Sequence, residues 1–227
     1  IQFAKQYNLT NSVNQNMGRK WNAVTGGGVV FASVVMLAAL VLENLDFVEF
    51  SNFSPILATS ILISVLGFYN DFINISKFNR FIILIFLILM LLYSNINLPI
   101  IRNFNGFLGL NDIGLFPGLI FTSFVYIYII NIIKISDGID GYLAIFSIFF
   151  FTSLLYNFDI NQFYTLNSVS VIIIASSFTF LKYNFSKSKK LFLGNAGSLF
   201  IGFWIATYLI TYITSAPTSK LVEVYSL

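Results

Sequence analysis

Long uncharged and mostly apolar runs alternate with short polar segments along the whole chain. Each run reaches the roughly 17–25 residues that an α-helix needs to cross about 30 Å of hydrocarbon. The pattern therefore predicts an all-α fold, a polytopic integral membrane helix bundle with about seven transmembrane helices. The predicted spans are residues 23–42, 50–70, 81–101, 113–133, 141–158, 160–181 and 191–219.

The polar segments differ in charge on the two sides of this predicted bundle. If successive spans alternate in direction, ten of the twelve Lys and Arg residues lie on one side. By the positive-inside rule this side is cytoplasmic. The carboxylates predicted there are Asp71, Asp137 and Asp140, whereas the acids of the other side are scattered in short loops and suggest no function. The ten basic residues are Lys5, Arg19, Lys20, Lys77, Arg80, Lys134, Lys182, Lys187, Lys189 and Lys190.

The composition agrees with a membrane protein and limits its chemistry. Hydrophobic residues make up 57% of the chain, charged residues 9%, and the mean hydropathy is +0.84, which argues against a water-soluble protein. The net charge of +3 is explained by membrane orientation and by attraction to anionic headgroups or phosphates, so we expect no nucleic-acid partner. The absence of Cys and His excludes thiolate chemistry and the commonest general base. Catalysis would have to use Asp, Lys, Arg and Asn with a metal ion.

Nearly every residue falls in a predicted span or a short loop, so we expect a single transmembrane domain over residues 1–227. The chain begins inside a polar segment without Met and ends soon after its last span. We therefore expect this domain to be truncated at both ends. The oligomeric state stays open, and a homodimer is compatible with this composition.

Two polar segments on the basic side place carboxylates beside span ends. In residues 67–80, Asn70 and Asp71 end one span, and Lys77 and Arg80 lead into the next, where we interpret the two cations as interfacial anchors. In residues 131–141, Asp137 and Asp140 are three positions apart and each precedes Gly. They favour either a solvated turn or a Mg²⁺ site, since this ion prefers oxygen ligands and accepts one or two carboxylates with substrate phosphates. For Lys134, we favour an interfacial anchor over a contact with phosphate.

Two further segments are rich in small residues. Gly194–Ser198 begins a long apolar helix, whose free N–H groups would attract phosphate, although a small-residue packing face between membrane helices is the stronger interpretation. Thr25–Gly28 is either a phosphate-facing loop or a flexible start of a helix.

Together these segments resemble the polyprenyl-phosphate N-acetylhexosamine-1-phosphate transferases, which form glycosyltransferase family 4. GFYNDFINIS resembles the family's GF-x-DD-x-x-x-(L/I)-S segment, and NIIKISDGIDGYLA resembles N-x-x-N-x-x-DG-x-DGLA. FLGNAGSLFIGF resembles FLGDAGSLFLGF, and RKWNAVTGGGVVF resembles RK-x-H-x-x-x-TP-x-GG. The likeness covers residues from about 10 to 205, with the motifs in the family's order.

The resemblance implies an enzyme of the bacterial inner (cytoplasmic) membrane that transfers N-acetylhexosamine-1-phosphate from a UDP-sugar to undecaprenyl phosphate. UMP is released, Mg²⁺ is the implied cofactor with Mn²⁺ as an alternative, and the product starts a cell-envelope glycan. The family default donor is UDP-GlcNAc. The residues implied as catalytic are Asp71, Asn70, Asp137 and Asp140; those implied in metal binding are Asp71, Asn195 and Asp137; and those implied in substrate binding are Lys20, Asn131, Lys134, Asn184, Lys190, Gly194 and Ser198.

The chain departs from the family pattern at chemically important positions. Asn70 and Asn195 stand where the family has Asp, Asn22 stands where it has His, and Lys134 stands where it has a second Asn. An amide oxygen binds Mg²⁺ more weakly than a carboxylate, so we expect reduced metal affinity. The family's later His-containing loop has no counterpart before Leu227.

Two alternatives to an active transferase follow. The first is a catalytically inactive relative that acts as a membrane scaffold or lipid-phosphate binder. The second is a transporter, which the position of the acids at span ends, away from mid-membrane, makes less suitable.

Overall fold

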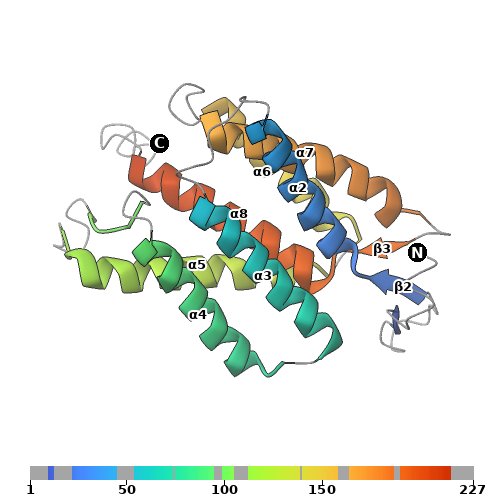
Figure 1. The fold of residues 1–227 in the computed structure, drawn as a ribbon, viewed down its shortest axis with the longest axis horizontal. Coiled ribbons are helices and arrows are strands. Elements are labelled where there is room, and N and C mark those ends of the chain that lie inside the picture. Colours follow the sequence, from blue (N-terminus) through green and yellow to red (C-terminus); the bar gives the residue numbers. More distant parts are fainter. Residues whose placement is uncertain are drawn as a thin grey trace, which may run out of the picture.

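The computed structural model describes residues 10–12, 22–44, 54–73, 75–94, 99–104, 112–138, 140–157, 164–186 and 190–215. Within these ranges the chain forms seven helices and three short strands (Figure 1). The helices are α2 (Gly27–Asn44), α3 (Ser54–Phe72), α4 (Lys77–Ser94), α5 (Leu115–Ser136), α6 (Tyr142–Asn157), α7 (Tyr164–Asn184) and α8 (Gly194–Ser215). Six are long and apolar enough to cross a membrane, and α6 is a shorter apolar helix. The predicted polytopic membrane bundle is confirmed.

The helix boundaries differ from the predicted spans because charged residues lie inside several helices. α4 begins at Lys77, four residues before the predicted span, and carries Arg80 one turn further on. α5 and α7 continue past Lys134 and Lys182, respectively. A long basic side chain near a helix end extends its charge to the polar interface while the backbone stays helical. Because the predicted spans contained only uncharged residues, they placed the start of α4 too late and the ends of α5 and α7 too early.

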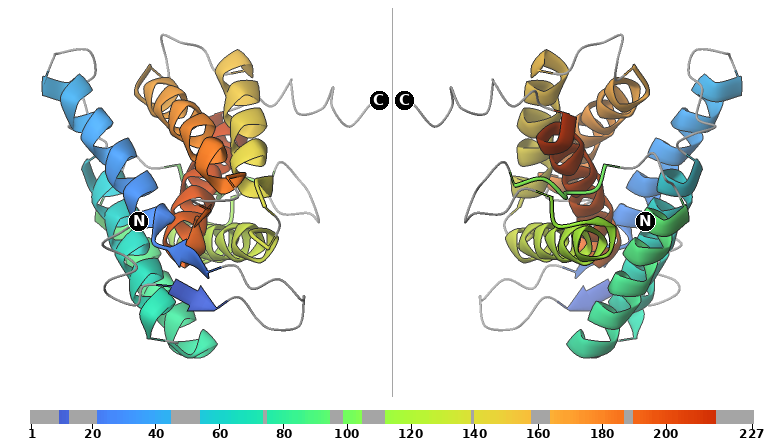
Figure 2. Two further views of the ribbon diagram at one scale, coloured as in Figure 1. Left: turned by 90° about the vertical axis from the view of Figure 1, so that its right-hand side faces the viewer. Right: turned by 90° about the vertical axis from the view of Figure 1, so that its left-hand side faces the viewer.

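Helix α8 lies at the centre of the bundle, as both views in Figure 2 show. It packs against α2, α3, α5 and α6. A helix that is apolar on every side is expected to be buried. The large side chains of α8 bear this out, since Phe200, Phe203, Trp204 and Tyr208 are wholly inaccessible. The surrounding helices expose apolar side chains, including Phe78, Phe86, Phe116 and Phe149, as surfaces that face lipid do.

The backbones of α2 and α8 approach closely through glycine. A Cβ atom on Gly28 would lie 2.1 Å from the backbone nitrogen of Gly197, and one on Gly197 would lie 2.8 Å from the Cα of Gly28. No side chain fits this contact. The small residues of Gly194–Ser198 thus take part in helix packing, as the stronger interpretation had it, and in the other segment Gly27–Gly28 form the first turn of α2.

A small sheet, which the sequence did not predict, precedes α2 and α8. Strand β1 (Thr10–Ser12) pairs antiparallel with β2 (Asn22–Thr25), and β2 pairs parallel with β3 (Leu191–Phe192). The register joins Val24 to Leu191 and Thr25 to Phe192. Because the strands have two to four residues, they show no alternating pattern long enough to be recognised. The pairing ties the start of α2 to the start of α8.

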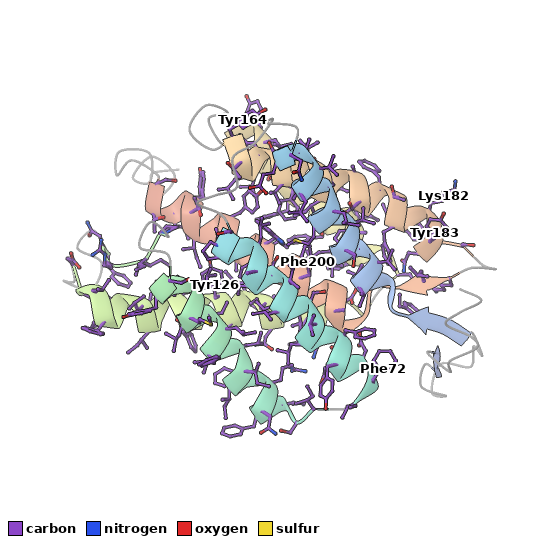
Figure 3. The ribbon with its side chains drawn as sticks, in the orientation of Figure 1. Phe72, Tyr126, Tyr164, Lys182, Tyr183 and Phe200 are labelled. Carbon is purple, nitrogen blue, oxygen red and sulfur yellow. The ribbon has the colours of Figure 1, made fainter. Side chains whose placement is uncertain are left out.

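The helices alternate in direction, so their polar ends gather on one side of the molecule. At this end, which we call the basic end, α3, α5 and α7 finish and α2, α4, α6 and α8 begin (Figure 1). Figure 3 shows Phe72 at the end of α3 and Lys182 with Tyr183 at the end of α7, all at the basic end. The charged residues described at this end are Asp71, Lys77, Arg80, Lys134, Asp137, Asp140, Lys182 and Lys190.

Candidate functional site

The site is built around Asp71, whose carboxylate accepts hydrogen bonds from the first residues of α8. Its Oδ1 accepts hydrogen bonds from the backbone N–H of Asn195 at 3.0 Å and from the side-chain amide of Asn195 at 2.6 Å. Its Oδ2 accepts from the backbone N–H of Ala196 at 3.4 Å. The first N–H groups of a helix have no partner within it and carry a partial positive charge. Asp71 thus caps α8 from another helix.

Two glycines make this contact sterically possible. Gly67 lies one turn before Asp71 on the same face of α3, and a Cβ there would come within 2.6 Å of the Cα of Ala196. Gly194 has φ of +68°, a left-handed conformation that L side chains rarely adopt, and a Cβ there would lie 2.8 Å from Oδ2 of Asp71. The G-N-A-G sequence therefore lets α8 begin directly beneath the carboxylate.

This arrangement corrects the expectation of free N–H groups at the start of α8. The N–H groups of Asn195 and Ala196 are already directed at Asp71, so they do not present an open phosphate site. The hydroxyl of Ser198 is buried and donates to the carbonyl of Gly194 at 2.9 Å. Binding of substrate by Gly194 and Ser198 stays a prediction, and their observed contacts are structural.

Asn70 lies beside Asp71 but has a different role in the structure. Its side chain is buried, with 8% of its surface exposed, and its Oδ1 accepts the backbone N–H of Ile75 at 3.2 Å. This bond connects the end of α3 to the residues that lead into α4. Asn70 therefore shapes the α3–α4 connection, and a catalytic role for its amide stays a prediction.

Asp137 follows α5 and lies in the electrostatic field of Asp71. Its backbone N–H donates to the carbonyl of Lys134 at 3.4 Å and ends the helix. Burial, together with the negative charge of Asp71, raises the pKa of the Asp137 carboxyl from 3.8 to about 7. A cation near Asp137 would favour the ionised form of this carboxyl.

Asp140 lies in the same loop and is held by Lys190 through a hydrogen-bonded ion pair. The ammonium of Lys190 also lies 5.2 Å from the ring centroid of Phe192. Asn184 donates its amide N–H to the carbonyl of Leu191 at 2.7 Å, while its buried Oδ1 has no partner among the described residues. Asp137, Asp140 and Asn184 share a cavity of about 20 Å³. This volume suits one water molecule.

A larger hollow of about 690 Å³ opens between α4 and α5. Its cationic lining consists of Lys77, Arg80 and Lys134, and the amide of Asn131 lies among them. The charges of Arg80, Asp71 and Lys77 act electrostatically on the ammonium of Lys134. The remaining lining side chains are apolar: Phe78, Phe81 and Ile135. A hollow that is cationic on one part of its wall and apolar on another suits an amphipathic anion.

Lys77 and Arg80 were not among the predicted site residues, yet they line this hollow, and their interpretation as anchors stays a prediction. The spacing of Lys77 and Arg80 could have indicated that they act together, because residues three apart in the first turn of a helix share a face. Lys20 lies outside the described residues, and so does the side chain of Asn22. Asn131 donates to the carbonyl of Ile127 at 2.8 Å and lines the hollow, so its predicted place near substrate agrees with its position.

The donors at the basic end fit a metal ion only in part. No group of three or more His, Cys, Asp and Glu side chains that could hold a metal occurs among the described residues. Mg²⁺ commonly binds one or two carboxylates and completes its shell with water and substrate phosphates. Asp71 acts electrostatically on Asp137, and a cation bound near the two carboxylates would offset that effect. The residues therefore fit a metal shared with substrate, rather than one held by protein alone.

The raised pKa of Asp137 predicts a pH-dependent stability. The unfolded chain loses this proton near pH 4, whereas the folded chain keeps it until about pH 7, so stability falls as the pH rises between these values. In chelator, Asp137→Asn should therefore be more stable than the wild type by about 1–2 kcal/mol at pH 8, and the difference should disappear below about pH 4. Thermal unfolding in detergent across this range measures it. A difference that does not change with pH would contradict the prediction.

The comparison with protein families agrees with this geometry. The family described as Glycosyl transferase family 4 matches residues 53–213. The matched region runs from the start of α3 almost to the end of α8 and contains Asp71, Lys134, Asp137 and Asn195. A comparison with curated proteins gave no match. Because the family match covers more than half of the 227 residues, this multi-pass membrane chain belongs to glycosyl transferase family 4.

Proposed function

We propose that this protein transfers N-acetylhexosamine-1-phosphate from a UDP-sugar to undecaprenyl phosphate and releases UMP. The observation that carries this proposal is the hollow between α4 and α5, which Lys77, Arg80 and Lys134 line and where Asp71 acts electrostatically on Lys134. The cations suit phosphate groups, and the apolar wall suits the first units of an isoprenoid chain. Family membership supports the same class of reaction.

In the proposed reaction, an oxygen of the lipid phosphate forms a bond to the sugar-linked phosphorus of the UDP-sugar. The bond from this phosphorus to the bridging oxygen breaks, and that oxygen leaves with UMP. A phosphate monoester with a second pKa of about 6 is already ionised at neutral pH. The protein therefore needs no strong general base. Its main contribution is to position two anions and to stabilise the charge of the transferring group.

The residues divide this work by position. Lys77, Arg80 and Lys134 bind phosphate oxygens and offset the repulsion between the two substrates. Asp71 and Asp137 would hold Mg²⁺, which supplies positive charge to the diphosphate when bound. Asp71 also keeps α8 in place, and the rigid α8 backbone supports the site.

The pair Asp140–Lys190 and the neighbouring Asn184 form the other part of the proposed site. Asp140 and Asn184 line the small cavity together with Asp137, and Lys190 forms an ion pair with Asp140. Their polar groups suit the nucleotide or sugar part of the donor. The basic end would face the cytoplasm of a bacterial inner membrane, where a soluble UDP-sugar and a lipid phosphate meet.

The experiment is a transfer assay on the full chain in detergent micelles. Radiolabelled UDP-GlcNAc and undecaprenyl phosphate are supplied with Mg²⁺, and both UMP and the lipid-linked sugar phosphate are measured. We expect equal amounts of the two products. Asp137→Asn should reduce their formation by about 100-fold or more, while Asp112→Asn, at the other end of the bundle, should leave it unchanged. Absence of both products in the wild type would overturn the proposal.

A second candidate is a lipid-phosphate binder without transferase activity. Asn195 favours it, because this residue directs an amide N–H, and not a carboxylate, toward Asp71. This candidate predicts saturable binding of undecaprenyl phosphate together with no release of UMP. The same protein preparation distinguishes the two functions.

A further inference from the structure

The described site carries more positive charge than the motifs that it resembles. Asn70 and Asn195 each remove one negative charge from the family pattern, and Lys134 adds one positive charge where the pattern has Asn. The three differences make the site more positive by three charges. All three residues lie at the basic end. Asn70 precedes Asp71 in the sequence, and Asn195 donates a side-chain hydrogen bond to Asp71.

The structure places the added charge of Lys134 on the wall of the cationic hollow. Lys134 is in Coulombic range of Asp71, and Asp137 follows it by three residues at the end of α5. It also lines the hollow together with Lys77 and Arg80, which are on α4. The Lys134 ammonium therefore lines the hollow and also interacts electrostatically with Asp71.

We propose that Lys134 is a built-in cation that allows this site to bind a diphosphate or phosphate without a divalent metal ion. The inference rests on the proposed function, because it assumes that the hollow receives the phosphates of the substrates. The ammonium is a compact charge with three N–H donors, so it can donate to more than one phosphate oxygen in the hollow that it lines.

The neighbouring cations support this inference by their effect on a metal ion. Lys77, Arg80 and Lys134 together repel a divalent cation from the hollow, and the hydrogen bonds from α8 already satisfy part of Asp71. Weak metal binding would not prevent phosphate binding here, because three protein cations face the phosphate. Removing Lys134 should therefore make phosphate binding depend on added metal.

The test measures binding of UDP and of inorganic pyrophosphate to the full chain in detergent micelles, by calorimetry, with Mg²⁺ and with EDTA. In the wild type, EDTA should weaken binding by less than about threefold, a difference below 1 kcal/mol. Lys134→Asn should weaken binding in EDTA by about tenfold or more, the loss expected for one charged hydrogen bond. Mg²⁺ should restore much of that loss. Lys134→Arg keeps the charge and should keep binding in EDTA.

The control is Lys182→Asn, which removes an exposed charge at the same end of the bundle but outside the hollow. It should bind as the wild type does under both conditions, and thermal unfolding verifies that each variant is folded. Loss of wild-type binding in EDTA, with binding kept in Mg²⁺, would overturn the role of Lys134 and leave the proposed function intact. Equal binding of Lys134→Asn and wild type in EDTA would overturn it as well. No binding under either condition would overturn both proposals.

Discussion

Replacing Asp71 by Ala should destabilise the protein by about 2–3 kcal/mol, as the loss of a partly buried charged helix cap does. Both oxygens of this carboxylate accept hydrogen bonds from α8, and two of the donors are backbone N–H groups at the start of that helix. These N–H groups would be left without a partner, and α3 would lose its polar contact with α8. Thermal unfolding in detergent measures the effect.

The chain offers a matched control at the other end of the bundle. Asp112 also accepts a backbone N–H next to a helix, from Gly114 at 2.7 Å, but the contact is single and exposed. Asp112→Ala should therefore lower stability by less than about 1 kcal/mol. If the two variants unfold at the same temperature, Asp71 does not hold α8 in the way the hydrogen bonds indicate. Asp71→Asn keeps one acceptor oxygen and should lie between them.

The membrane architecture could be predicted because it follows from properties of single residues. A helix in lipid satisfies its own backbone groups, so a run of apolar residues is enough to identify it. The alternation of direction then brought Asp71, Asp137 and Asp140 to one end, which is what the structure shows. The grouping of these three residues was thus predicted from span order and charge.

The contacts inside the site could not be predicted in the same way. Asp71 and Asn195 are 124 residues apart, and no local pattern indicates that one caps the helix of the other. The pairing of Asp140 with Lys190 spans 50 residues and presents the same difficulty. The motif comparison placed these residues in one site, but only the structure shows which side chains contact each other.

The local sequence around Lys134 leaves its role open between an anchor and a phosphate contact. A lysine near the end of a membrane helix is expected to extend toward the interface as an anchor. Here the hollow between α4 and α5 lies beside it, with two further cations on its wall. Three like charges gathered in one place disfavour one another, so an anionic ligand bound among them would be favourable, as the proposed function requires.

Changing Asn195 to Asp should make the stability of the protein depend on a divalent metal ion. The amide nitrogen of Asn195 lies 2.6 Å from Oδ1 of Asp71, so the variant would place two carboxylate oxygens in that contact. In chelator we expect a loss of about 2–3 kcal/mol, from the lost hydrogen bond and the repulsion between like charges. Adding Mg²⁺ should recover most of that loss, because a hard cation binds oxygen ligands and neutralises both groups.

The measurement is thermal unfolding of wild type and variant in detergent, with EDTA and with a series of Mg²⁺ concentrations. Asn195→Ala is the control, since it loses the same hydrogen bond but adds no charge, and its unfolding temperature should not respond to Mg²⁺. The wild type should also respond little, because its amide already satisfies Asp71 without a metal. If Asn195→Asp unfolds at the same temperature with and without Mg²⁺, the amide is not what separates this chain from a metal-binding relative. If the expected dependence is observed, a single side chain, in contact with Asp71, sets how strongly this contact binds a divalent metal ion.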